Sequence, residues 1–514
     1  MAAPLIPWNL GAVPRPWGEH PSLYSYLAST ARGEVAELRL ADDDASKLHF
    51  APGAVDSLSL AHGDTAALWP RQLAQALVAL HDDATPNHFE HLYRLATRDG
   101  TAQVASAFLD EVYARRTTLD PDRLASIARV FAREAPQRDA VKLGIVLFAL
   151  FNDERSEDSE LLQTLGRHEE FTRFVGGAME GRGAGERALF ELAQEVHGWG
   201  RIDLVERLAS TEDPEIRRWM LRHGHENNIN HGYSALTCAE TGGLLAALKT
   251  FQVELDVLRA AQKILSSLLD GLPFPGFEAY KDGEDALRLF VRHACRLSPN
   301  LTFYSTVMEA RAHLAEAASV YKPLIAQCDR YLHHDAWPAL VRDALADPES
   351  AVFDDAEDMA KTFGIDSFDA HFARAKQDPY RSLTWFQLTQ VSDDARIDVV
   401  LAHAASVLPL SRLCTGAANS TGAGPDYPLY SVLGFVLQGL GRFPGRGEPF
   451  VIAGLRSPVV RNRHMAIRAV SAWGRERWSD ALRGALQDAA EVEPTDEVHE
   501  SLQRCLRGEP WDPG

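Results

Sequence analysis

A helical periodicity runs from about residue 66 to residue 505 of this 514-residue sequence, and it limits the folds that the chain can adopt more than any other feature. Amphipathic segments of about 10–16 residues follow one another, separated by short polar breaks. In one of them, Leu124, Ile127 and Phe131 fall on a single helical face, and an Asp-Pro pair precedes them. The following segment, residues 140–151, is apolar nearly all round and has to be covered on most sides. An amphipathic helix followed by a buried helix is typical of stacked helix pairs.

A helix-start signal, Asp-Pro or Ser-Pro, recurs along the chain. It occurs at residues 120–121, 213–214, 347–348, 378–379 and 457–458. In such a pair the polar residue caps the helix and proline occupies its first turn. The intervals predict units of about 30–45 residues, the length of two-helix repeats. We therefore expect an all-α fold, a HEAT/armadillo-like α-solenoid of stacked helix pairs; the alternative is one large irregular helical domain.

The N-terminal segment, residues 1–65, differs from the rest of the chain. It is rich in proline, and two short alternating runs, residues 35–40 and 57–60, are candidate strands. The expected organisation has four parts. They are an irregular N-terminal segment (1–65), HEAT-like helical repeats (66–350), an acidic and then loop-rich helical region (351–440), and a C-terminal HEAT-like repeat with a basic face (441–514).

Two stretches resemble known repeats in their residues. Residues 455–470 read Leu-Arg-Ser-Pro-Val-Val-Arg-Asn-Arg-His-Met-Ala-Ile-Arg-Ala-Val and resemble the core of a HEAT repeat, with proline opening a helix. Residues 138–150 are similar to the inner helix of such a repeat. This resemblance implies a stack of helix pairs, an architecture that exposes long surfaces for partners.

A second resemblance covers about residues 30–350. Residues 165–172, 199–202 and 215–219 resemble a bacterial family labelled limonene hydroxylase. That label implies NAD-linked oxidation of a monoterpene such as limonene, but the shared positions look structural and give no catalytic residue. The most similar glycine-rich turn, residues 181–185, lies between helical segments without the strand that a dinucleotide site requires. We expect no cofactor.

The net charge and the cysteine content indicate which binding partners and which cellular compartment the sequence favours. Lys+Arg 52 against Asp+Glu 72 gives a net charge of −20. This charge disfavours a nucleic-acid-binding protein and an anionic membrane surface. The five cysteines are scattered without a Cys-x-x-Cys pair, which favours a reducing, cytoplasmic location. The most apolar stretch, residues 141–151, is too short to cross a bilayer. The oligomeric state stays open.

One polar cluster could hold a metal ion. His225, Glu226 and His231 carry the side chains that bind zinc or iron. Their spacing is not His-Glu-x-x-His, and Gly224 indicates the end of a helix. We interpret the cluster as a polar turn between helices, with metal binding as the alternative.

A basic stretch near the C-terminus contrasts with an acidic stretch before it. Residues 442–483 have a net charge of +6, and residues 335–370 have a net charge of −8. Six arginines form the predicted partner-binding surface: Arg456, Arg461, Arg463, Arg468, Arg475 and Arg477. Its expected ligand is an acidic protein segment, either from a partner or from residues 335–370 of the same chain.

Taken together, these patterns favour a non-catalytic protein over an enzyme. The predicted function is a helical-repeat scaffold or adaptor that binds a protein partner on its concave face. The alternative is the NAD-linked oxidoreductase that the second resemblance implies. A third possibility is a HEAT-like DNA-binding or DNA-glycosylase-type protein, which the negative net charge disfavours.

Overall fold

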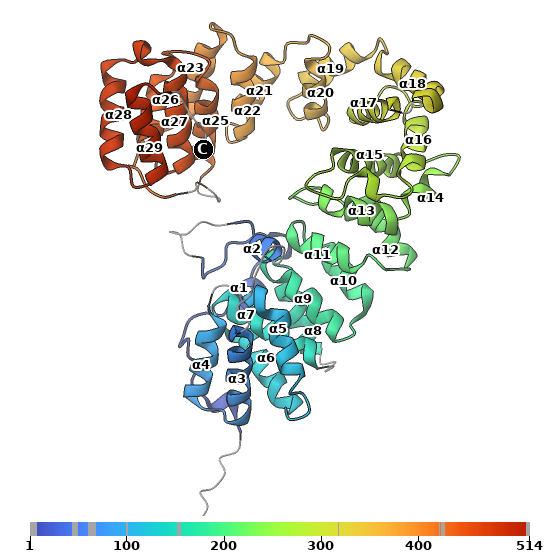
Figure 1. The fold of residues 1–514 in the computed structure, drawn as a ribbon, viewed down its shortest axis with the longest axis vertical. Coiled ribbons are helices and arrows are strands. Elements are labelled where there is room, and N and C mark those ends of the chain that lie inside the picture. The colour runs from blue at the N-terminus through green and yellow to red at the C-terminus, as the bar shows by residue number, and fades with distance from the viewer. Residues whose placement is uncertain are drawn as a thin grey trace, which may run out of the picture. The chain divides into compact units, whose positions relative to one another are not determined.

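The computed structural model describes residues 8–43, 50–59, 68–98, 101–151, 156–316, 318–420, 422 and 427–509. These residues form 29 α-helices and no β-strand, as the helical periodicity predicts (Figure 1). They divide into two compact units. Of the described residues, unit 1 holds those up to Leu297 together with Thr306–Cys328, and unit 2 holds Ser298–Ser305 and those from Asp329 onward. The four-part organisation expected from the sequence stays a prediction.

Unit 1 begins with short helices and continues as a succession of longer ones. Its helices are α1 (Leu23–Ala28), α2 (Ala54–Ser59), α3 (Leu68–Asp82), α4 (Pro86–Ala96), α5 (Thr101–Tyr113), α6 (Pro121–Glu134), α7 (Arg138–Leu147), α8 (Ser156–Gly166), α9 (Glu169–Gly181), α10 (Gly185–Ala193), α11 (Trp199–Arg207), α12 (Pro214–Trp219), α13 (Gly232–Thr241), α14 (Leu244–Leu248), α15 (Leu255–Asp270) and α16 (Gly283–Ala294). Helices α17 (Leu301–Ala315) and α18 (Ala318–Leu332) carry residues of both units.

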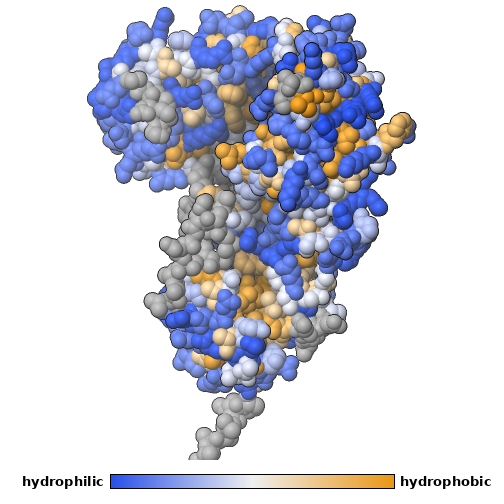
Figure 2. All heavy atoms as spheres, turned by 45° about the vertical axis from the view of Figure 1, so that its right-hand side comes forward, coloured by the Kyte–Doolittle hydropathy of each residue, from blue (hydrophilic) through white to orange (hydrophobic). Residues whose placement is uncertain are grey.

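Unit 2 contains the remaining helices. They are α19 (Trp337–Ala346), α20 (Phe353–Ala360), α21 (Phe368–Gln377), α22 (Ser382–Val391), α23 (Arg396–Val407), α24 (Leu410–Leu413), α25 (Pro428–Leu440), α26 (Glu448–Leu455), α27 (Val460–Trp473), α28 (Asp480–Val492) and α29 (Asp496–Arg507). The apolar faces of α21 to α29 meet in one core that includes Trp385, Val436 and Ile467. The outer surface drawn in Figure 2 is mainly hydrophilic, with hydrophobic residues in separate patches.

Within each unit, alternate helices lie side by side. In unit 1, α5, α7, α9, α11, α13 and α15 each contact the next member of this series. In unit 2, α22, α25, α27 and α29 form one such series, while α24, α26 and α28 form a second that packs against it. Gly439 permits the close approach of α25 to α22, because a Cβ atom at this position would overlap the side chain of Thr389.

Several contacts between neighbouring helices join residues about 28–33 positions apart, whereas others, such as Gln262 with Thr306 and Arg442 with Thr389, join residues 44 and 53 positions apart. Arg129 with Asp158, Arg167 with Glu195, Glu169 with Gly198 and Glu206 with Thr237 are 28–31 residues apart in unit 1. Tyr430 with Asn462, Leu440 with Trp473 and Arg463 with Glu493 are 30–33 residues apart in unit 2. Successive contacts advance in the same direction along both helices, so the helices of one series run parallel.

Some of the predicted helix starts agree with the structure and others do not. Helices α6 and α12 begin at Pro121 and Pro214, each capped by the preceding aspartate, as predicted. At Asp347 and Asp378 the prediction is wrong. Each of these carboxylates instead accepts the N–H two residues later within a turn, and the next helix begins at Phe353 or at Ser382.

The two candidate strands are not strands. Residues 35–40 are irregular, and their backbone groups bond to helix ends rather than to another strand: the Ala36 carbonyl accepts the Glu169 N–H at 3.0 Å. In the second run, residues 57–59 belong to helix α2, and Leu60 lies outside the described residues. The alternating pattern marked positions that dock on the helices, since Val35 and Leu40 are both buried.

Candidate functional site

Helix α27 carries the centre of the predicted partner-binding surface. The predicted helix start at Ser457 and Pro458 is wrong: the Ser457 hydroxyl accepts the Val459 N–H within a turn, and the helix begins at Val460 without a side-chain cap. Arg461 and Arg468 are exposed and seven residues apart, which places them on the same side of the helix. Ala466, Ile467 and Val470 are buried on the other side. Burial of this apolar stripe therefore leaves the two arginines in solvent.

Arg463 does not belong to that surface, which corrects the prediction. Its side chain is 1% exposed, and its Nε and Nη2 atoms each lie 2.7 Å from a carboxylate oxygen of Glu493, which is 0% exposed. Its Nη1 donates to the carbonyls of Ala418 and Ser457. The position lies three, four and seven residues before the buried stripe, so the helix turns it inward. Arg463 is a structural residue that joins α27 to the segment after α28.

The other arginines of the set differ in what they contact. Arg456 is exposed and forms an ion pair with Asp488 at 3.2 Å. Arg475 and Arg477 follow α27 in a short 3-10 turn, where Arg475 lies 6.0 Å from the ring of Trp478. Neither Arg461 nor Arg468 forms an ion pair with a carboxylate among the described residues. These two positive charges are exposed and not neutralised by the chain.

Aromatic side chains from two further helices lie beside Arg461. Its guanidinium is 4.5 Å from the ring centroid of Phe435 in α25, and that ring is 6.2 Å from the ring of Phe386 in α22. Both rings are half-buried. Arg442, after α25, donates to the carbonyls of Thr389 and Gln390 at the end of α22. We call Phe386, Phe435, Arg442, Arg461 and Arg468 the arginine face.

Two carboxylates of the acidic stretch, residues 335–370, form ion pairs with arginines that follow it in the sequence. Asp354 pairs with Arg374 at 2.7 Å, and Asp366 pairs with Arg396 at 2.5 Å. Both arginines also lie over phenylalanine rings. Within the described part of unit 2, no ion pair joins this stretch to the arginine face. Intramolecular pairing therefore does not occupy Arg461 or Arg468.

The histidine cluster does not form a set of metal ligands. Glu226 is engaged on both oxygens, by Lys263 Nζ at 2.9 Å and by His223 Nδ1 at 3.2 Å. His225 is fully buried, and its ring lies edge-on to that of His231 with centroids 5.6 Å apart. Burial lowers the pKa of His225 to about 3, so its ring is neutral at physiological pH. Across the described ranges, no group of three His, Cys, Asp or Glu side chains is arranged to hold a metal ion.

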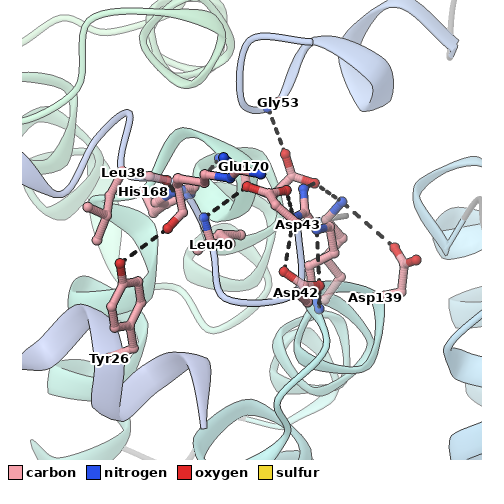
Figure 3. A network of polar contacts seen from close by, with 12 residues as sticks. Tyr26, Leu38, Leu40, Asp42, Asp43, Gly53, Asp139, His168 and Glu170 are labelled. Atoms are coloured by element: carbon pink, nitrogen blue, oxygen red, sulfur yellow. Dashed lines mark hydrogen bonds and ion pairs between the residues drawn. The ribbon is translucent and has the colours of Figure 1, made fainter. Parts of the chain in front are cut away.

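The structure also brings together a buried charge cluster that sequence reasoning missed (Figure 3). Lys142, in the middle of α7, is 3% exposed, and its Nζ lies 2.6 Å from both Asp56 Oδ2 and Glu170 Oε1. Asp139, one turn earlier in α7, is 3.8 Å from the same nitrogen. A lysine among apolar residues of α7 was the available signal, since a buried cation requires carboxylate partners. The partners come from α2 and α9, which the sequence alone could not place.

This cluster fastens an N-terminal strap, residues 35–43 and 50–56, across the beginnings of α7 and α9. Asp42 accepts hydrogen bonds from the backbone N–H and the guanidinium of Arg138, and Asp43 pairs with the same guanidinium. His168 Nε2 lies 2.7 Å from the Leu38 carbonyl, and the Gly53 N–H donates to Glu170. Figure 3 shows the strap carboxylates converging with those of the helices.

Carboxylates within the cluster have opposite pKa shifts. Burial acts to raise the pKa of Glu170, but the cations of Lys142 and Arg138 outweigh it and hold the pKa below its usual value. Burial raises the pKa of Asp139 to about 6, with repulsion from Asp56 and Glu170 adding to the effect. For Lys142, burial acts to lower the pKa, yet the three carboxylates raise it overall. The cluster therefore holds more carboxylates than its cations neutralise.

Comparison with known proteins adds no identity to this geometry. No family model matches the chain, and no curated protein matches it. The glycine-rich residues 181–185 lie at the junction of α9 and α10, with no strand before them in the described structure. Among the helices described, none combines the length and the apolar character needed to span a membrane. The arginine face and the buried cluster are the two features on which a functional argument can rest.

Proposed function

We propose that this protein is a non-catalytic scaffold, an α-solenoid of HEAT-like helix pairs that binds a protein partner on one helical layer. The observation that supports this proposal most is a separation of about 28–33 residues that recurs among hydrogen-bonded positions in both units. Hydrogen bonds join positions 28–31 residues apart in unit 1 and 30–33 apart in unit 2. A recurring separation of this kind is the structural signature of repeated helix pairs, even where the repeats have diverged in sequence.

The α22–α25–α27 layer offers such a scaffold a surface for a partner. Three successive helices contribute adjacent side chains there, Phe386, Phe435 and Arg461. Aromatic residues and arginine are the types that contribute most to binding at protein interfaces. Because the backbones of the layer are held by their second series of helices, the surface is preorganised, which lowers the entropic cost of binding.

Site-specific photo-crosslinking in the native host tests this proposal. Ala472 is exposed on α27 and Gln487 is exposed on α28, in the other series of helices. A photoreactive phenylalanine at position 472 should give one discrete adduct with another protein, while the same residue at position 487 provides the matched control. Equal labelling at both positions, or no adduct at 472, would contradict a partner on this layer.

A further inference from the structure

The charges left unpaired on the arginine face indicate what kind of segment it can bind. Arg456 forms an ion pair with Asp488, and Arg463 forms an ion pair with Glu493. Arg461 and Arg468 have none among the described residues, and Arg442 donates to the carbonyls of Thr389 and Gln390 and lies over the Phe443 ring. Two guanidinium groups of α27 and one from the segment after α25 thus present positive charge to solvent. A ligand that carries carboxylates would pair with these guanidinium groups through charge-assisted hydrogen bonds.

The position of Arg461 adds an apolar requirement. Its guanidinium lies over the Phe435 ring, 4.5 Å from the centroid, and its Nη2 contacts Gln438 Oε1 at 3.3 Å. Stacking on the ring holds the guanidinium plane and leaves donors directed to solvent. The half-buried rings of Phe435 and Phe386 form the apolar part of the arginine face next to this charge. A ligand that contacts both parts needs an apolar side chain next to its carboxylates.

We infer that the arginine face binds an extended acidic segment of a protein partner, with an aromatic or aliphatic side chain between its carboxylates. Arg461 and Arg468 are separated by about 10 Å along α27, since an α-helix rises 1.5 Å per residue. A chain in the extended polyproline II conformation covers this distance in about three residues and places residues three apart on the same side. The matching segment therefore has carboxylates about three residues apart, with the apolar side chain directed to Phe435.

Among the described residues, no ion pair joins the chain's own acidic stretch, residues 335–370, to the arginine face, and nucleic acid fits the surface less well. The acidic stretch, residues 335–370, already pairs Asp354 and Asp366 with Arg374 and Arg396. A nucleic-acid duplex would approach a protein of net charge −20 against a repulsive long-range field. A short acidic segment interacts mainly with the local charges, because salt screens the rest beyond about 10 Å. This inference rests on the proposed scaffold function and names the class of its partner.

Fluorescence anisotropy with defined probes tests the inference on the full-length protein. The probe is a labelled peptide of about twelve residues built from Asp, Glu, Phe and Gly, and its control replaces the acids by Asn and Gln. The acidic peptide should bind and the amide peptide should not, with affinity falling as salt rises. Arg461→Glu/Arg468→Glu should weaken binding by about tenfold or more. Arg456→Glu, a matched reversal of an exposed but paired arginine, should change it less than about twofold.

Other results would overturn the inference. Absence of peptide binding, or equal loss with Arg456→Glu and with the double reversal, contradicts recognition by the arginine face. Tighter binding of a duplex of about twenty base pairs, abolished by the double reversal, assigns the surface to nucleic acid instead. If the adduct at position 472 persists in the double-reversal variant, the scaffold proposal stands and only the acidic class of partner fails.

Discussion

Lys142 in unit 1 and Arg463 in unit 2 are both buried cations, yet their surroundings differ in charge balance. Arg463 meets one carboxylate, from Glu493, and donates its remaining hydrogens to carbonyls. Lys142 meets Asp56, Glu170 and Asp139 within 4 Å. The charges at the Arg463 site balance, whereas the Lys142 site has an excess of negative charge. A balanced pair fixes two elements together at any ordinary pH, while an overcharged cluster makes protonation part of its stability.

The largest expected effect comes from breaking the balanced pair. Arg463→Met leaves the fully buried Glu493 without its cation and removes donors from the Ala418 and Ser457 carbonyls. The free energy of unfolding should fall by about 3–5 kcal/mol in urea denaturation. The double variant Arg463→Met/Glu493→Gln should recover part of this loss. A single variant as stable as the wild type would show that the pair does not hold α27 in place.

Lys142→Met should have a large effect that depends on pH. The variant leaves Asp56, Asp139 and Glu170 close together without their shared cation, and at pH 8 we expect a loss of about 3 kcal/mol. Protonation relieves part of this repulsion, so the loss should be smaller at pH 5. The matched measurement is Arg463→Met at the same two pH values, for which a smaller change is expected. Identical pH dependence of the two variants would contradict the contrast between the sites.

The variant Asp139→Asn tests how the excess negative charge around Lys142 affects stability. The pKa of Asp139 is about 6 in the folded protein against 3.8 for an ordinary aspartate, so the folded chain holds this proton more tightly than the unfolded chain. The free energy of unfolding of the wild type should therefore rise relative to that of the variant as pH falls from 7 to 5. At pH 7.5 the variant should be as stable as the wild type or up to about 2 kcal/mol more stable. Buried histidines such as His168 and His225 affect both proteins alike, so only the difference is diagnostic.

The smallest effect on stability is expected for the arginine face. Arg461→Glu/Arg468→Glu changes two exposed side chains that make no ion pair within the described chain, so the free energy of unfolding should change by less than about 0.5 kcal/mol. Thermal unfolding monitored by circular dichroism checks this. Destabilisation as large as that of Arg463→Met would show that these arginines hold the fold and are not a free binding surface.

The arginines of α27 show how far sequence reasoning reaches. The seven-residue spacing of Arg461 and Arg468 opposite the apolar stripe correctly predicts their exposure. The same periodicity places Arg463 on the stripe, so its burial could have been predicted from its offset to Ala466 and Ile467. Its partner Glu493 could not, because that residue lies 30 positions away and comes into contact only through the packing of α27.

Local sequence patterns were enough to predict the helical class, the capped starts of α6 and α12, and the outward side of α27, because these depend on residues within one or two turns. Which charges meet depends on how the helices pack. Packing placed the strap over α7 and α9 and surrounded Lys142 with carboxylates from separate elements. Helix propensity and capping are local, whereas pairing between helices depends on the whole packed arrangement, which periodicity in one segment does not encode.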